Sequence, residues 1–232
     1  RLLTHQLEIL GQLPPEELRH IVDFAESGRP MVGFRTATHA FRYPDSSAYA
    51  HMNNTWPARV FGQQWITHHG HFEDGRAPLT DVRISGDSSH PVLRGVKPFR
   101  AYSWLYHVDG GNWSLSGDSN PLLNGKALRS AHQEEGRLEE FPLENPVAWT
   151  KTYTGAGGKP SRVFFTTLGH PYDFKDPNMR RLALNGILWS LGQTAPDSLN
   201  VGFAAPYNPN HSGFGQRFKS GMRPLDPDTF KP

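Results

Sequence analysis

The sequence contains no cysteine among its 232 residues. This excludes disulfide bonds, thiolate zinc sites and a cysteine nucleophile, and it leaves the redox compartment of the protein open. No apolar run approaches the roughly 20 residues that a membrane-spanning helix needs, so we expect no transmembrane segment. A block of basic residues is also missing and the net charge is only +2, which makes nucleic acid a poor candidate for a partner.

Glycine and proline are abundant, with 23 and 20 residues, and they predict many loops and extended segments. The chain begins abruptly at RLLTHQLEIL. We expect that a preceding segment, either part of the domain or a removed targeting sequence, is missing. We leave the location open and favour a periplasmic or other extracytoplasmic location over the cytoplasm.

Local patterns in the first part of the chain predict a helix, a turn and a strand in that order. The segment PPEEL places proline and acidic residues in a first helical turn, and Gly28 ends the helix. The apolar run MVGF, residues 31–34, predicts a short buried strand. The loop-rich middle contains two strand-like runs, TDVRIS (80–85) and AYSWLYHV (101–108). This alternation indicates an α/β domain.

Residues 145–192 carry the clearest pattern. PVAWTKTY (146–153) and SRVFFTTLG (161–169) read as an antiparallel pair, because the turn between them is too short for a crossover. Asp176 and Pro177 then begin a buried helix that stops at Gly192. We therefore predict one domain over residues 1–195, with its N-terminal part incomplete, followed by an extended Pro/Gly-rich tail over residues 196–232.

Histidine is the side chain in unusual supply, with 12 residues. Neutral imidazoles suit zinc and related divalent metals, so His69, His90 and His170 are candidate ligands. The alternative is that these histidines cap loops and bond to the backbone. His170 also precedes Asp173 by three residues, as a base and an orienting acid do, although Asp173 could equally begin the next helix. A set of tryptophans and one tyrosine could stack on sugars or could belong to the core or an interface: Trp56, Trp65, Trp104, Tyr106, Trp113 and Trp149.

Several motifs together resemble the ThuA-like family, which is named for a trehalose-utilisation protein. They are GRPMVGFRTATHAF, QQWITHHG, SSHPVLRGV, NPVAWTKTY, SRVFFTTLGHPYDF and RRLALNGILWSL. The resemblance covers roughly residues 14–192. The resemblance implies the class I glutamine-amidotransferase-like fold. We therefore expect a flavodoxin-like three-layer sandwich with a mostly parallel sheet, an antiparallel pair near the C-terminal end and the extended tail.

The resemblance also implies that the turn after the first strand lacks the nucleophile of the amidotransferases. In the amidotransferases this turn carries the cysteine nucleophile, and GFRTAT places Arg35 there. The amidotransferases also have a late His-Pro-Glu motif that supplies a base and an orienting acid. GHPYD places His170 at its histidine, and Asp173 lies one position beyond its glutamate. Because a guanidinium stays protonated, glutamine hydrolysis by this route is excluded. The expected site, at the carboxyl ends of the strands, comprises Arg35, Thr36, His39, Trp65, His69, His90, His170 and Asp173.

Three hypotheses for the function follow. The first is a protein that binds or acts on a carbohydrate or sugar derivative, with His39, His170 and Asp173 as catalytic candidates, Arg35, Thr36, Trp65 and His69 as substrate-binding candidates, and zinc as a candidate cofactor. The second is an inactive accessory subunit that docks on a protein partner through residues 197–232. The third is a hydrolase that uses Thr36 or Thr38 with His39, which adjacent side chains rarely permit.

Overall fold

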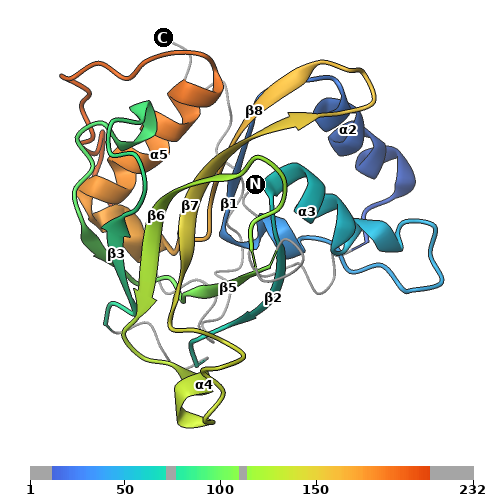
Figure 1. Ribbon diagram of the computed structural model, residues 1–232. Coiled ribbons are helices and arrows are strands. Elements are labelled where there is room, and N and C mark those ends of the chain that lie inside the picture. The colour runs from blue at the N-terminus through green and yellow to red at the C-terminus, as the bar shows by residue number, and fades with distance from the viewer. Residues whose placement is uncertain (1–11, 72–76, 110–113, 210–232) are drawn as a thin grey trace.

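The computed structural model describes residues 12–71, 77–109 and 114–209 (Figure 1). Its helices are α2 (Pro15–Glu26), α3 (Thr55–Phe61), α4 (Ala131–Glu134) and α5 (Pro177–Ser190). Its strands are β1 (Met31–Phe34), β2 (Gln64–His68), β3 (Thr80–Ile84), β4 (Phe99–Ala101), β5 (Tyr106–Asp109), β6 (Asn120–Ala127), β7 (Glu144–Thr154) and β8 (Pro160–Thr166). Short 3-10 turns include η1 (Arg35–His39), η2 (Ala50–Met52), η3 (Pro91–Leu93) and η4 (Pro171–Lys175). In this part of the chain no helix is long and apolar enough to cross a membrane.

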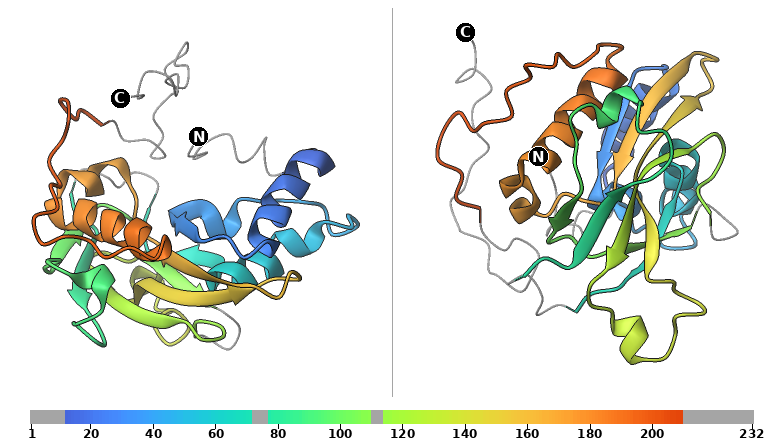
Figure 2. Two further views of the ribbon diagram at one scale, coloured as in Figure 1. Left: turned by 90° about the horizontal axis from the view of Figure 1, so that it is seen from above. Right: turned by 60° about the vertical axis from the view of Figure 1, so that its left-hand side comes forward.

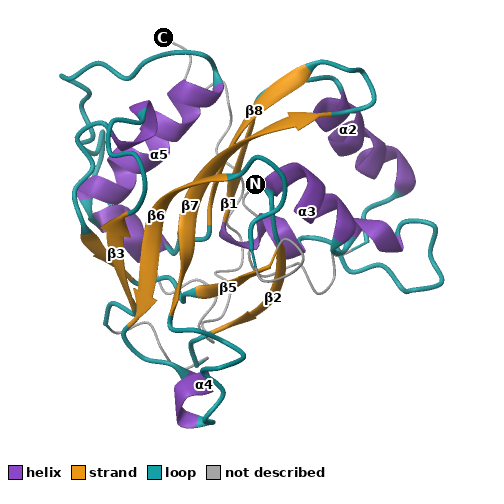
Figure 3. Cartoon of the chain, in the orientation of Figure 1, coloured by secondary structure: helices purple, strands orange, loops and turns teal. Residues whose placement is uncertain are grey.

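A curled six-stranded sheet in the order β1-β8-β7-β6-β3-β4 forms the centre of the domain (Figure 3). Only β1 and β8 run parallel, and every other neighbouring pair in this sheet is antiparallel. The expectation of a mostly parallel, flavodoxin-like sheet was therefore wrong. The reason lies in β6, β3 and β4, which extend the predicted β7–β8 hairpin by further antiparallel pairings.

Helices cover both faces of this sheet, as the α/β assignment predicted (Figures 1 and 2). Alternate residues of a strand point to opposite faces, and β8 shows the result. Phe164 packs in one core cluster with Met179 and Leu182 of α5. Its neighbours Val163 and Phe165 pack in a second cluster, which contains apolar residues of α2 and α3.

The predicted helix boundaries and the hairpin are confirmed. Pro15 opens α2, and Gly28 follows its end with a φ of +74°, a conformation that favours glycine. The Asp176 side chain accepts a hydrogen bond from the Asn178 amide and caps α5. Strand β7 pairs with β8 from Ala148↔Thr166 to Thr154↔Pro160.

The curl of the sheet brings together strand ends that are far apart in strand order. The alternating pairings make β4 run in the same direction as β1 and β8. Their carboxyl ends therefore lie on the same rim of the sheet. Strand β4 reaches η4, which follows β8, and β2 lies beside η1, which follows β1. This rim collects the chemistry-bearing segments.

The described part of the tail, residues 196–209, contains no helix or strand and lies on its own domain. Arg181 of α5 donates to the Leu199 carbonyl at 3.2 Å, and Tyr207 donates to the Pro171 carbonyl at 2.7 Å. The guanidinium of Arg180 also sits 4.2 Å from the Phe203 ring centroid. The rest of the predicted partner-binding tail, residues 210–232, lies outside the described residues.

Candidate functional site

The turn after β1 has the strained backbone that a functional elbow requires. Arg35 has a φ of +47° and is the one non-glycine residue with positive φ in the part of the chain that the structure describes. Such a conformation costs a residue with a side chain about 1–2 kcal/mol. A strained strand-to-helix turn of this kind presents the nucleophile in α/β-hydrolases. Here the turn presents a guanidinium, as the GFRTAT motif predicted.

The segments around Arg35 and His170 meet at one serine, Ser103, which follows β4. Arg35 Nη1 donates to Ser103 Oγ at 3.0 Å. The amides of Gly169 and His170 donate to the same oxygen at 3.1 and 3.0 Å. Ser103 Oγ in turn donates to Asp173 Oδ2 at 2.5 Å. The expected convergence of the two segments at the rim of the sheet is thus present.

Asp173 is fully buried and its carboxylate is surrounded by donors. Oδ1 accepts from the amides of Tyr102 and Ser103 at 2.6 and 3.1 Å, and Oδ2 accepts from those of Gly169 and His170 at 2.9 and 3.0 Å. Several such bonds to one carboxylate offset the cost of burying its charge. Through these contacts Asp173 holds Ser103 and the segment around Gly169 and His170 in place. They agree with the alternative that Asp173 has a structural role at the start of the segment leading into α5.

His170 takes the same local role at the start of η4. Its Nδ1 accepts a hydrogen bond from the Tyr172 amide at 3.0 Å, so the neutral ring carries its hydrogen on Nε2. The ring is fully buried and stacks on Tyr102 with a centroid separation of 6.2 Å. His170 and Asp173 thus form a capping box and fasten the segment that supports Ser103.

Aromatic rings surround the guanidinium of Arg35, and we call this group the Arg35 cluster. It consists of Arg35, His39, Trp65, His68, Trp104 and Tyr106. The guanidinium carbon lies 5.6 Å from the Trp104 centroid and 5.9 Å from that of Tyr106, within range for a cation–π interaction. The rings also contact one another, with His68 stacked on Trp104 at 4.0 Å and His39 against Trp65 at 4.7 Å.

The Arg35 cluster has a buried floor and a partly exposed rim. Arg35, Trp104 and Tyr106 are buried, whereas His39, Trp65 and His68 are half-buried. Burial, and next the charge of Arg35, lower the pKa of His39 and of His68 to about 4. Both imidazoles are therefore neutral at pH 7 and can donate and accept hydrogen bonds. Burial likewise raises the pKa of the Tyr106 phenol, which stays protonated.

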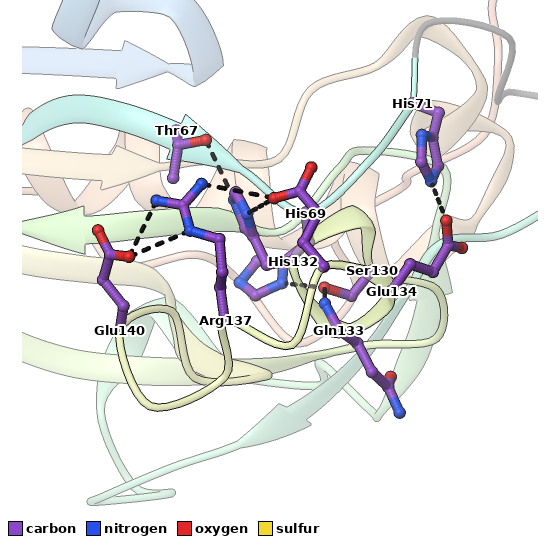
Figure 4. Close-up of polar contacts among 10 residues, drawn as sticks. Thr67, His69, His71, Ser130, His132, Gln133, Glu134, Arg137 and Glu140 are labelled. Atoms are coloured by element: carbon purple, nitrogen blue, oxygen red, sulfur yellow. Dashed lines mark hydrogen bonds and ion pairs between the residues drawn. The ribbon is translucent and has the colours of Figure 1, made fainter.

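His68, and not the predicted His69, joins the Arg35 cluster. Successive side chains point to opposite sides of an extended segment, so the His69 side chain points away from the cluster toward α4. There His69 Nδ1 lies 2.8 Å from Ser130 Oγ, and His132 Nε2 lies 3.1 Å from Thr67 Oγ1 (Figure 4). His69 with these neighbours anchors α4 to the end of β2.

Thr36 and His90, the remaining predicted site residues, lie at two different 3-10 turns. Thr36 is half-buried in η1, directly after Arg35. His90 caps η3 through the Val92 amide, and its ring lies 5.6 Å from that of Trp189 on α5. His69, His90 and His170 thus have different surroundings, and no group of three or more metal-binding side chains converges in the described residues. A zinc site built on these three histidines stays a prediction.

Sequence reasoning missed Ser103 altogether, and it treated Trp104 and Tyr106 only as members of a general aromatic set. The run AYSWLYHV was expected to be one strand, but the structure breaks it into the end of β4, a bend at Ser103 and β5. The signal was present as a serine that interrupts an aromatic run. Thr80 Oγ1 stabilises the bend by donating to the Ser103 carbonyl at 2.8 Å.

The fold and this site together define an α/β protein with a strained strand-to-helix elbow at Arg35. A family model described as ThuA, trehalose utilisation, matches residues 7–190. The chain therefore belongs to the ThuA family, as the motifs predicted. None of the curated proteins and none of the solved structures matches it.

Proposed function

We propose that this protein binds, and acts on, a carbohydrate or sugar derivative at the Arg35 cluster. The observation that supports this proposal most strongly is the set of half-buried rings His39, Trp65 and His68. They contact the aromatic rings of Trp104 and Tyr106, which pack on the buried guanidinium. Small-molecule sites combine apolar and aromatic walls with a few fixed polar groups, and the apolar face of a sugar ring packs on such walls. The family description, trehalose utilisation, is consistent with this substrate class.

Unpaired polar atoms in the cluster add support. His39 Nδ1 and Trp65 Nε1 are buried and have no hydrogen-bond partner within the described residues. Leaving a buried polar group unpaired costs about 1–3 kcal/mol. Hydroxyl groups of a bound sugar are suited to pair with them, since a hydroxyl both donates and accepts.

The chemistry we propose is non-covalent or proton transfer. Arginine cannot serve as a nucleophile, because its guanidinium remains protonated. His39 is the best-placed base, since its imidazole is neutral at pH 7 and lies at the half-buried rim. His170 and Asp173, the other catalytic candidates, act in this proposal by holding Ser103 and therefore Arg35.

Tryptophan fluorescence titrations with trehalose and glucose at pH 7 test the binding. Trp65→Phe should lower the affinity for the sugar, because it removes the indole that contacts His39. The matched control is Trp189→Phe on α5, where the ring lies against His90. Equal effects of the two variants, or the absence of any sugar-dependent change in the wild type, would contradict the proposal. Addition of zinc in parallel tests the predicted metal.

The alternative, an inactive subunit docked through residues 197–232, is favoured by Arg35 at the nucleophile position. Its described segment, however, bonds to α5 and Pro171 of the same chain. The mass of the native particle distinguishes the accessory subunit from the sugar-binding protein. A larger assembly that dissociates on deletion of residues 197–232 supports the subunit, and a monomer with sugar-dependent fluorescence supports the binding protein.

A further inference from the structure

We propose that the Arg35 cluster prefers a sugar derivative that carries an oxyanion, a carboxylate or a phosphate, over a neutral sugar. This inference rests on the proposed function and specifies its substrate class. The shared chemistry is a single anionic group attached to a sugar ring.

The first observation is the position of the positive charge. The Arg35 guanidinium is buried and lies over the faces of Trp104 and Tyr106. The half-buried rings of His68 and His39 contact these two aromatic rings. Between aromatic walls the effective dielectric constant is lower than in water, so the charge acts more strongly on a ligand at the rim. In the part of the chain that the structure describes, the His39 and His68 rings at the rim are neutral at pH 7, and the charge of Arg35 acts on both.

The second observation is that the balancing negative charge lies on the other side of Ser103. The Asp173 carboxylate accepts from the backbone amides of Tyr102, Ser103, Gly169 and His170, and Ser103 Oγ stands between it and Arg35. The two charges thus form an oriented pair, with the positive end toward the His39 and His68 rim.

The charges of Arg35 and Asp173 also influence different residues, on opposite sides of Ser103. Burial is the largest cause of the lowered pKa of His39 and His68 and of the raised pKa of Tyr207 on the tail. Next to burial, the Arg35 charge acts on the two histidines and the Asp173 charge acts on Tyr207. The rim therefore experiences a positive potential and the η4 side a negative one. We expect an anion at the rim to gain more from the Arg35 charge than it loses to the Asp173 charge, because four backbone amides bond to that carboxylate.

Calorimetric titrations with glucose, glucuronate and glucose 6-phosphate at pH 7 test the preference. We expect at least one of the two anionic sugars to bind ten-fold or more tightly than glucose, and the two anions separate the carboxylate from the phosphate as the preferred group. Arg35→Gln should abolish the difference. The control Arg83→Gln, at an exposed arginine paired with Asp81, should retain it.

The wild-type protein supplies a second measurement that needs no variant. Raising the salt concentration from 0.05 to about 0.5 M should weaken the binding of the anionic sugar and leave that of glucose unchanged, because salt screens charges. This salt dependence tests the anion preference even if the Arg35→Gln variant does not fold. Glucose binding as tightly as both anions overturns the anion preference and leaves the proposed function standing. Failure of all three sugars to bind overturns both.

Discussion

Arg35 and Asp173 are joined through a single hydroxyl group. The guanidinium of Arg35 donates to Ser103 Oγ at 3.0 Å, and this oxygen donates to the Asp173 carboxylate at 2.5 Å. The three residues lie in the segments that follow three different strands, β1, β4 and β8. Ser103 therefore links the backbone strain at Arg35 to the buried charge at Asp173, and its side chain is the natural place to test the site.

Ser103→Ala should lower both stability and ligand affinity. The substitution removes the only hydroxyl in this link and deprives Asp173 Oδ2 of one donor, while the Gly169 and His170 amides remain bonded to that oxygen. Leaving a buried charged group with one unmet bond costs about 1–3 kcal/mol in the free energy of unfolding. Urea denaturation measures the loss, and calorimetry measures the affinity.

Ser89→Ala is the matched control for this experiment. Ser89 Oγ also donates to an aspartate, Asp87 Oδ1, at 2.6 Å, but this pair is exposed. Its removal should change the stability by no more than about 0.5 kcal/mol. A similar loss in both variants would show that the Ser103 link has no special energetic role.

Gly70→Ala should displace Trp104 and disturb the Arg35 cluster. A Cβ at position 70 would lie 1.8 Å from Trp104 Cδ1, so the indole must move. Overpacking of this kind costs about 1–3 kcal/mol. We expect a lower melting temperature together with altered near-ultraviolet circular dichroism, since the environment of a tryptophan changes.

Gly158→Ala separates this steric effect from backbone strain. Gly158 has a φ of +69°, and a Cβ there would meet nothing within 4 Å. The variant should lose about 1 kcal/mol through its backbone with the aromatic spectrum unchanged. An unaltered spectrum in Gly70→Ala would disprove the predicted displacement of Trp104.

The stability of the protein should fall on acidification from pH 6.5 to about 4. Burial lowers the pKa of His39, His68 and His69 to about 4. Between that value and the ordinary pKa of 6.5, the unfolded chain binds protons that the native protein does not. Stability therefore rises with pH in this window, by up to about 1.4 kcal/mol per pH unit for each histidine, and these histidines add no slope outside it.

Urea denaturation at several pH values checks this slope. Carboxylates also titrate near the lower end of the window, so the comparison with His39→Gln is decisive. The variant cannot bind the extra proton on unfolding and should have a shallower slope than the wild type between pH 5 and 6.5. An unchanged slope would mean that His39 does not contribute.

Tyr207→Phe should loosen η4 as well as lower stability. The Tyr207 hydroxyl donates to the Pro171 carbonyl at 2.7 Å, next to His170. Loss of the bond costs about 0.5–1.5 kcal/mol. Tyr43→Phe is matched, because Tyr43 donates to the Leu13 carbonyl at 3.1 Å. Only Tyr207→Phe should speed amide hydrogen exchange over residues 170–175. Equal exchange there in both variants would contradict this role of the tail.

Elements with strong local signals were predictable from the sequence. Helices α2 and α5 have proline at their starts and glycine past their ends, and the short turn between β7 and β8 permits only an antiparallel pair. Strand β6 was missed because NPLLNGKA is rich in residues that favour turns. Gly125 is nevertheless suited to this strand, since a Cβ there would lie 2.5 Å from Val147 Cγ1.

The parts that could not be predicted depend on tertiary arrangement. The parallel orientation was inferred from the resemblance, and the pairings of β6, β7 and β3 reverse it. Ser103 belongs to no motif, and its role arises only because the curled sheet returns β4 to η4. Whether His68 or His69 faces Arg35 is decided by a one-residue register that the sequence HHGH leaves open.

The strand order also constrains how the protein is made. Strand β1 pairs only with β8 in the six-stranded sheet, from Met31↔Val163 to Phe34↔Thr166, although most of the domain separates them along the chain. During synthesis on the ribosome, β1 must therefore wait for nearly the whole domain to emerge before it finds its partner. High contact order of this kind slows folding and prolongs the exposure of apolar segments. We therefore expect the elbow at Arg35, which follows β1, to acquire its strained conformation late in folding.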